Sequence, residues 1–137
     1  MKAFIDTSSL IKKYVEEKGS DEFNNLLESV SEIIVSPITI LEIHSVLERR
    51  LREKTLRSTD AKWIEKEFSI DLDYFGIVQW NDNLINECIR VIRKHQLRVL
   101  DGIQLSSALI SNPPLFITSD KRLHTAAKKE LSQVKFI

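Results

Sequence analysis

The sequence predicts an α/β fold with a parallel sheet, and three observations support this prediction. Short β-branched or aromatic runs recur along the chain and are separated by amphipathic stretches of helical period, which is typical of strands that alternate with helices. Glycine and proline number three each, so loops are few and helices dominate. The chain of 137 residues, 42% of them hydrophobic, suits one domain over residues 1–137 that buries a substantial core.

Five short runs are the predicted strands: Ala3–Ile5, Ile33–Ser36, Gly76–Gln79, Leu115–Ile117 and Val134–Ile137. The clearest predicted helix begins at Thr39 and ends near Lys54, because apolar residues recur there at spacings of three and four. The other helices are predicted at Ser9–Glu17, Ser20–Val30, Thr59–Tyr74, Asn83–Lys94, Gly102–Ile110 and Lys121–Leu131. We expect the helix over 83–94 to descend along the sheet by roughly 18 Å. Residues 95–100, extended over about 20 Å, would then return Asp101 to the carboxyl edge of the sheet.

Composition narrows the classes of function. The 20 basic and 20 acidic residues give a formal net charge of zero, so any affinity for nucleic acid must be local. Cys88 is the only cysteine, which excludes an internal disulfide and Cys-rich zinc sites. No apolar run approaches the roughly 18 residues of a membrane span, and Asp6 comes too early for a signal peptide. We therefore expect a soluble, cytoplasmic protein with no membrane partner.

Four acidic residues stand where an element gives way to a helix: Asp6, Glu42, Asp101 and Asp120. One interpretation is structural, because Asp is a preferred N-cap and Thr39 with Glu42 forms a capping-box pattern. The other is a metal site, because the strand-to-helix turns of a parallel sheet share one edge, where open α/β folds bind ligands. Spacing alone leaves both open. Hydroxyl neighbours such as Ser8 and Thr118 favour a polar crevice, in which a divalent ion relieves the repulsion among carboxylates.

Four segments resemble the ordered motifs of the PIN-domain nucleases, and among these the VapC-type toxins: Phe4–Ser8, Ser36–Glu42, Leu97–Leu109 and Phe116–Leu123. The resemblance covers essentially the whole chain, and the order and intervals of the four motifs make it specific. It implies a three-layer α/β/α sandwich on a mostly parallel sheet of about five strands, with the first and fourth strands adjacent. It also implies a Mg²⁺ or Mn²⁺ site formed by the four acids, which are called the acidic quartet below.

Carried over position by position, the resemblance makes the acidic quartet the catalytic and metal-binding residues, with Asp6 and Asp101 as direct ligands. The other two acids bind directly or through water, and Ser8 and Thr118 hydrogen-bond a ligand or a metal-bound water. The implied activity is metal-assisted hydrolysis of RNA phosphodiester bonds by the toxin of a type II toxin–antitoxin pair. The implied partners are an RNA substrate, a small VapB-like antitoxin and a second copy, in a homodimer held by apolar faces of early helices.

Three basic residues close to the acids in sequence are candidate contacts to RNA phosphates: Arg98, Lys121 and Arg122. A haloacid-dehalogenase-like phosphatase is disfavoured because it needs a second Asp where Ser8 stands. A phospho-accepting receiver domain is disfavoured because it needs its acid after the third strand. The alternative from another class is a non-catalytic PIN-like RNA-binding or scaffold domain, which a metal-dependence assay separates from the enzyme.

Overall fold

The computed structural model describes residues 1–137 and contains one sheet of five parallel strands. The strands are β1 (Lys2–Ile5), β2 (Glu32–Val35), β3 (Gly76–Ile77), β4 (Leu115–Thr118) and β5 (Val134–Phe136). Their order is β3-β2-β1-β4-β5, so the chain builds one half of the sheet outward from β1 and then returns to build the other half. β1 and β4 are therefore adjacent at the point where the strand order reverses, as predicted.

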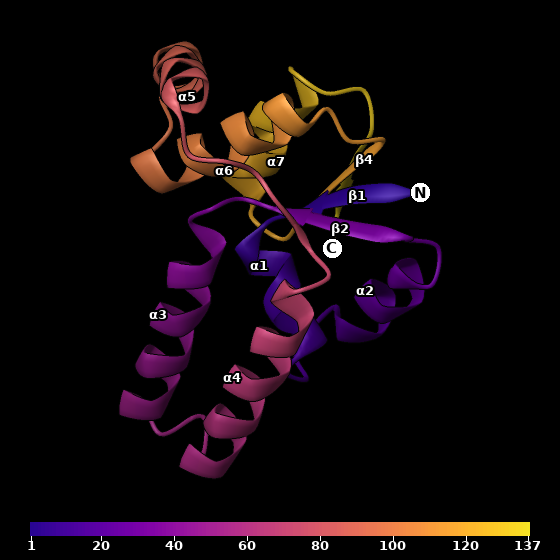
Figure 1. The fold of residues 1–137 in the computed structure, drawn as a ribbon, viewed down its shortest axis with the longest axis vertical. Coiled ribbons are helices and arrows are strands. Elements are labelled where there is room, and N and C mark those ends of the chain that lie inside the picture. Colours follow the sequence, from indigo (N-terminus) through magenta and orange to yellow (C-terminus); the bar gives the residue numbers. More distant parts are fainter.

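Helices cover both faces of this sheet. They are α1 (Thr7–Leu10), α2 (Ser20–Leu27), α3 (Thr39–Arg52), α4 (Ser58–Leu72), α5 (Asp82–His95), α6 (Val99–Ser111) and α7 (Lys121–Lys128). A 3₁₀ turn, η1 (Ile11–Lys13), continues α1. α1 to α4 lie on one side of the sheet and α5 to α7 on the other (Figure 1), which confirms the predicted α/β/α sandwich.

The alternation of side chains along β1 divides the core into two halves. Ala3 and Ile5 pack into the cluster under α1 to α4, whereas Phe4 packs into the cluster under α5 to α7. Phe4 stacks at a tilt on Phe116 of β4, with ring centroids 5.6 Å apart. All three β1 residues are completely buried. Because β1 is covered on both faces and paired on both edges, the residue that follows it, Asp6, is held in a fixed position.

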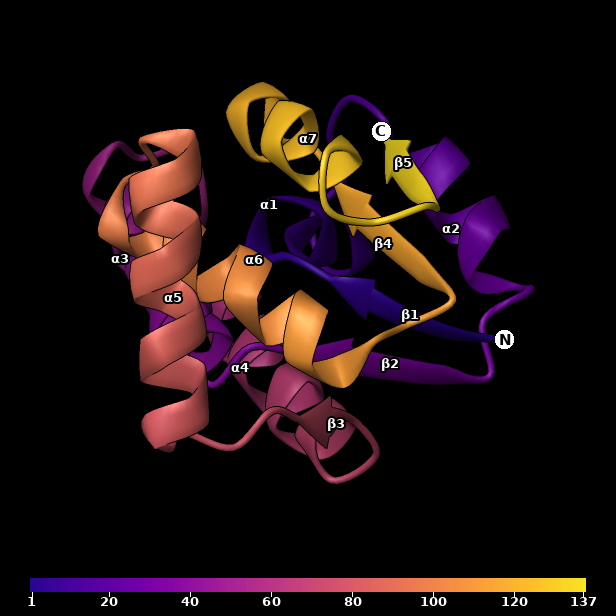
Figure 2. The same ribbon diagram turned by 90° about the horizontal axis from the view of Figure 1, so that it is seen from above.

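The position of α5 differs from the prediction. Instead of descending along the sheet, α5 crosses its carboxyl edge, and α6 then runs back over the sheet (Figure 2). Only Gln96–Arg98 connect the two helices, and Gln96 reverses the chain with a left-handed backbone at φ 53°. The predicted extended segment over 95–100 is therefore wrong. The first turn of α6 nevertheless lies at the carboxyl edge, because α5 already ends there, and it brings Asp101 to that edge.

The predicted helix over 9–17 is also misplaced: its helical residues run from Thr7 to Lys13. Glu17 lies beyond the helix and binds Lys12 and Arg50 at 3.0 and 2.6 Å, contacts that favour a loop over a further turn. Elsewhere the predicted boundaries shift by a few residues at most, as at α7, which ends at Lys128.

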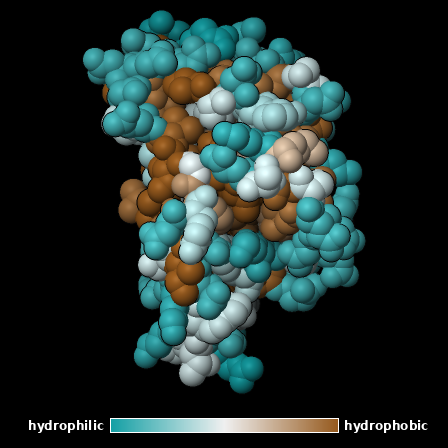
Figure 3. All heavy atoms as spheres, turned by 45° about the vertical axis from the view of Figure 1, so that its right-hand side comes forward, coloured by the Kyte–Doolittle hydropathy of each residue, from teal (hydrophilic) through white to brown (hydrophobic).

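Hydrophobic side chains also reach the surface. On the face drawn in Figure 3 they form a broken band between hydrophilic ones. Leu41 on α3, and Trp63 and Ile70 on α4, are exposed on the early helices. No helix of the chain is both long enough and apolar enough to span a membrane.

Candidate active site

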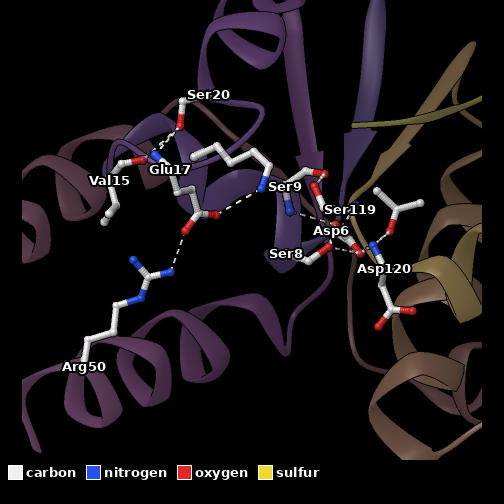
Figure 4. A network of polar contacts seen from close by, with 11 residues as sticks. Asp6, Ser8, Ser9, Val15, Glu17, Ser20, Arg50, Ser119 and Asp120 are labelled. Carbon is white, nitrogen blue, oxygen red and sulfur yellow. Dashed lines mark hydrogen bonds and ion pairs between the residues drawn. The ribbon is translucent and has the colours of Figure 1, made fainter. Parts of the chain in front are cut away.

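Asp6 is the centre of a polar network at the carboxyl ends of β1 and β4. Its carboxylate caps α1 by accepting from the Ser9 amide at 3.1 Å, so the structural role expected of an N-cap is present. It also accepts from the Ser8 hydroxyl at 2.8 and 2.9 Å and from the Thr118 hydroxyl at 2.6 Å (Figure 4). Only 3% of Asp6 is exposed, and this burial raises its pKa from 3.8 to about 6, although the three donors oppose the shift.

The turn after β4 is bound to the turn after β1. Thr118 donates to Asp6 and accepts from the Asp120 amide at 3.0 Å, while the Ser8 hydroxyl accepts from the Ser119 amide at 3.0 Å. Asp120 caps α7 through the Leu123 amide at 2.9 Å, so it too acts as an N-cap. The structure thus brings Ser8 and Thr118 onto the Asp6 carboxylate and places Asp120 beside them.

Glu42 does not form the predicted capping box. α3 starts after Ile38 without a side-chain cap, and the Thr39 amide binds the Ser36 carbonyl at 3.1 Å instead of Glu42. The Glu42 carboxylate accepts from Gln104 Nε2 at 2.7 Å and from the Thr7 hydroxyl at 3.0 Å. These long-range contacts turn the side chain away from its own helix end and toward the carboxyl edge of the sheet.

Asp101 lies in the first turn of α6, half-buried, while Arg98 occupies the N-cap position of that helix. Burial raises the pKa of Asp101, and the charges of Asp120 and Glu42 raise it further. Arg98 and Arg122 act in the opposite direction. The charges of three members of the acidic quartet therefore meet at Asp101, and Asp120 also acts on Asp6.

No member of the acidic quartet has an ion pair, although nine ion pairs of lysine or arginine occur elsewhere in the chain. This unbalanced set of oxygen donors fits a hard divalent cation such as Mg²⁺ or Mn²⁺ chemically. In the present side-chain arrangement, however, no three acidic, histidine or cysteine side chains converge on a common metal position. The members of the quartet act on one another electrostatically without forming a closed cage.

The three basic candidates divide into two groups. Arg98 and Arg122 are exposed and lie close enough to Asp101 for their charges to lower its pKa. Lys121 is exposed at the start of α7, directly after Asp120. None of the three has an acidic partner within ion-pair distance.

Gln104 and Thr7 belong to the site but were not predicted from the sequence. Gln104 Nε2 lies 2.7 Å from Glu42, 3.1 Å from the Thr7 hydroxyl and 3.2 Å from the Thr39 hydroxyl, so it holds Glu42 in place. Its Oε1 atom is buried without a hydrogen-bond partner. The sequence did contain a feature that could have identified Gln104. It is a long polar residue one turn after Asp101 on the otherwise buried face of α6, and a buried polar side chain needs a hydrogen-bond partner.

Comparison with known proteins shows which family the chain belongs to and which solved structures have a similar fold. No curated protein matches the chain. The chain is 19% identical to a chain of a toxin–antitoxin complex from Klebsiella pneumoniae, over 86% of both chains with a TM-score of 0.63. It is 14% identical to a chain of VapBC2 from Rickettsia felis bound to a promoter DNA fragment, over 100% and 99% of the two chains with a TM-score of 0.69. FitAcB from Neisseria gonorrhoeae gives 15% identity, 98% and 96% coverage and a TM-score of 0.70. A family model described as PIN domain matches residues 3–129, and this chain therefore belongs to the PIN domain family.

Proposed function

We propose that this protein is a divalent-metal-dependent endoribonuclease and the toxin of a type II toxin–antitoxin pair. The observation that carries the proposal is the set of four carboxylates without a single ion pair, at the carboxyl edge of a PIN-family sheet. Bringing carboxylates together without ion-pair partners costs free energy, and a divalent ion with oxygen ligands removes that cost.

Asp6, Asp101, Glu42 and Asp120 are the residues that would hold Mg²⁺ or Mn²⁺. When bound, such an ion supplies Lewis-acid chemistry at the scissile phosphate and lowers the pKa of a water molecule for attack. The chain itself positions the carboxylates: Thr118 and Ser8 fix both oxygens of Asp6, and Gln104 and Thr7 fix one oxygen of Glu42. Cleavage would leave 5′-phosphate and 3′-hydroxyl ends.

A groove beside the acidic quartet supports the proposal of a small protein antitoxin. It has a volume of about 580 Å³ and lies between α1 and α3, with Ser8 and Glu42 at the acidic end and Arg49 and Arg50 among its other lining residues. Leu41, 66% exposed, also lines it. Such a groove suits an apolar peptide segment that carries an Arg or Lys to the acids, because a cation can stand in for the charge of the metal. The similar complexes from Rickettsia felis and Neisseria gonorrhoeae are consistent with this partner.

A homodimer is proposed on the exposed apolar side chains of the early helices. Trp63 and Ile70 of α4 are each about half exposed. Burial of such side chains against a second copy is favourable. Sedimentation of the wild type beside Trp63→Ser, with Glu65→Ser as an exposed polar control on α4, tests this placement: only the Trp63 change is expected to shift the chain toward monomer.

Cleavage of labelled RNA by the purified chain tests the enzymatic proposal. The chain is expected to cleave RNA with Mg²⁺ or Mn²⁺, to lose this activity in excess chelator and to recover it when the ion is added back. Each of the variants Asp6→Asn, Glu42→Gln, Asp101→Asn and Asp120→Asn is expected to be inactive. Cleavage that persists undiminished in chelator would contradict metal dependence. RNA binding without cleavage under every ion condition would instead support a non-catalytic PIN-like binding domain, the alternative suggested by the lack of a converged metal cluster.

A further inference from the structure

We infer that a basic pocket between α5 and α7 binds a backbone phosphate of the RNA strand outside the acidic quartet. This inference rests on the proposed ribonuclease function and adds a binding site to it. The pocket has a volume of about 510 Å³ and is lined by the C-terminal end of α5 and by α7. Its polar lining is mostly basic or hydrogen-bonding: Lys94, His95, Gln96, Arg122, Thr125 and Lys129.

The positive charges that α7 contributes to this pocket have no ion-pair partners. Arg122 and Lys129 have no acidic partner, and no acidic side chain lines the pocket. Glu130, which pairs with Lys94 and His95 of the pocket, has a side chain that is only 10% exposed, and it binds Arg90, Lys94 and His95 at 2.8 to 3.2 Å. A protein with no net charge therefore carries a local excess of positive charge in a concave site.

The helix dipole accounts for the positions of some of these basic residues but not for all of them. Lys94 and Lys129 lie at the C-termini of α5 and α7, where the helix dipole favours a positive charge. Arg122 lies in the first turn of α7, where the dipole disfavours it. No ion pair offsets this cost, and an anionic ligand would.

The shape of the basic stripe favours a polymer over a single anion. Arg122, Thr125 and Lys129 follow one another at helical spacing on one face of α7, and the outer two are roughly 10 Å apart along the helix axis. Arg122 also acts electrostatically on Asp101, so the near end of the pocket borders the acidic quartet. A single strand that places one phosphate at the quartet can continue along α7 and place another between Arg122 and Lys129.

Binding of single-stranded RNA in the Asp6→Asn background tests this site, because cleavage is absent there. Lys129→Gln and Arg122→Gln are each expected to weaken binding about 3- to 10-fold irrespective of sequence, and to make the salt dependence shallower by about 0.7 in log–log slope for each lost phosphate contact. Lys128→Gln is the matched control: Lys128 is an exposed lysine at the same helix end, without an ion pair and outside the pocket. Its affinity and salt slope are expected to match the background.

The outcomes separate the site from the function. If Lys129→Gln and Arg122→Gln bind RNA as Lys128→Gln does while the unmodified chain still cleaves RNA, the phosphate site is wrong and the enzymatic proposal stands. If no variant binds RNA and the unmodified chain does not cleave it, both are overturned. If inorganic phosphate, compared with chloride at equal ionic strength, lowers the RNA affinity of the background but not that of Lys129→Gln, the pocket binds a phosphate group of the RNA as proposed. If phosphate weakens both equally, the phosphate site is placed wrongly.

Discussion

Replacing Asp6 by Asn is expected to stabilise the metal-free protein while abolishing cleavage. The rise of the Asp6 pKa from 3.8 to about 6 means that its ionised form costs the fold about 3 kcal/mol at neutral pH. Asn keeps the cap on the Ser9 amide, because Asn caps as well as Asp. Asn has only one acceptor oxygen and its amide nitrogen donates, so one of the two hydroxyl bonds must reverse, which costs about 1 kcal/mol. The net gain is therefore about 2 kcal/mol, or roughly 5–8 °C in melting temperature.

The pH dependence of this gain identifies its cause. Between about pH 4 and pH 6 the folded state holds more protons at Asp6 than the unfolded chain does, so the stability of the parent falls as pH rises through this window. The Asn variant does not titrate there. Its advantage should thus be complete at pH 7 and should turn into a loss of up to about 1 kcal/mol at pH 4, where only the cost of the reversed hydrogen bond remains.

Thermal melting in chelator at several pH values measures this difference, and a parallel series with Mg²⁺ or Mn²⁺ measures ion binding. Only the parent should gain stability from the ion, in proportion to its affinity. Asp73→Asn is the control, since Asp73 is exposed, has no side-chain partner and should change stability by less than about 0.5 kcal/mol. An Asp6→Asn variant that is less stable than the parent at pH 7 in chelator, or equally stabilised by the ion, would refute the reasoning.

Three further predictions concern the surroundings of the site. Gly102→Ala should destabilise the protein by about 1–3 kcal/mol in urea unfolding, because the new Cβ would lie 2.6 Å from Cγ1 of Ile92 on α5; an unchanged midpoint would show that α5 yields freely. Gln104→Leu should lower the cleavage rate at least about tenfold, since Glu42 loses its 2.7 Å donor; a folded variant with normal kcat would contradict the positioning role. Cleavage should fall in mild acid, with its half-point at or below about pH 6, because protons compete with the metal for Asp6; a rate that stays flat down to pH 4 would exclude this.

The sequence was sufficient to predict which strands form and where the acids gather. A parallel sheet sends every strand-to-helix turn to one edge, so the positions of Asp6 and Asp120 follow once β1 and β4 are recognised. The direction of α5 did not follow, because hydrophobic period identifies a helix without fixing its orientation. Nor did the sharp turn from α5 into α6 at Gln96, one of three non-glycine residues in the chain with positive φ.

The capping box at α3 shows a second limit. Thr39 and Glu42 satisfy the local motif, yet Gln104, 62 residues beyond Glu42, offers its amide to the same carboxylate at 2.7 Å. The Thr39 hydroxyl also contacts Gln104, at 3.2 Å. A local pattern cannot show that a distant donor will compete for its side chain, and here the distant donor prevails.

The link between the turns after β1 and β4 has a consequence for the order in which the site is completed. Asp6 is synthesised well before Thr118, which lies 112 residues later, yet its shortest hydrogen bond comes from the Thr118 hydroxyl, and its amide binds the Ile117 carbonyl at 3.2 Å. Until β4 has emerged from the ribosome and paired with β1, one edge of β1 is open and the Asp6 carboxylate lacks this donor. Contacts so distant in sequence form late, because loop closure must precede them. A nascent chain that ends before β4 therefore carries the first acid of the quartet without the contacts that position it.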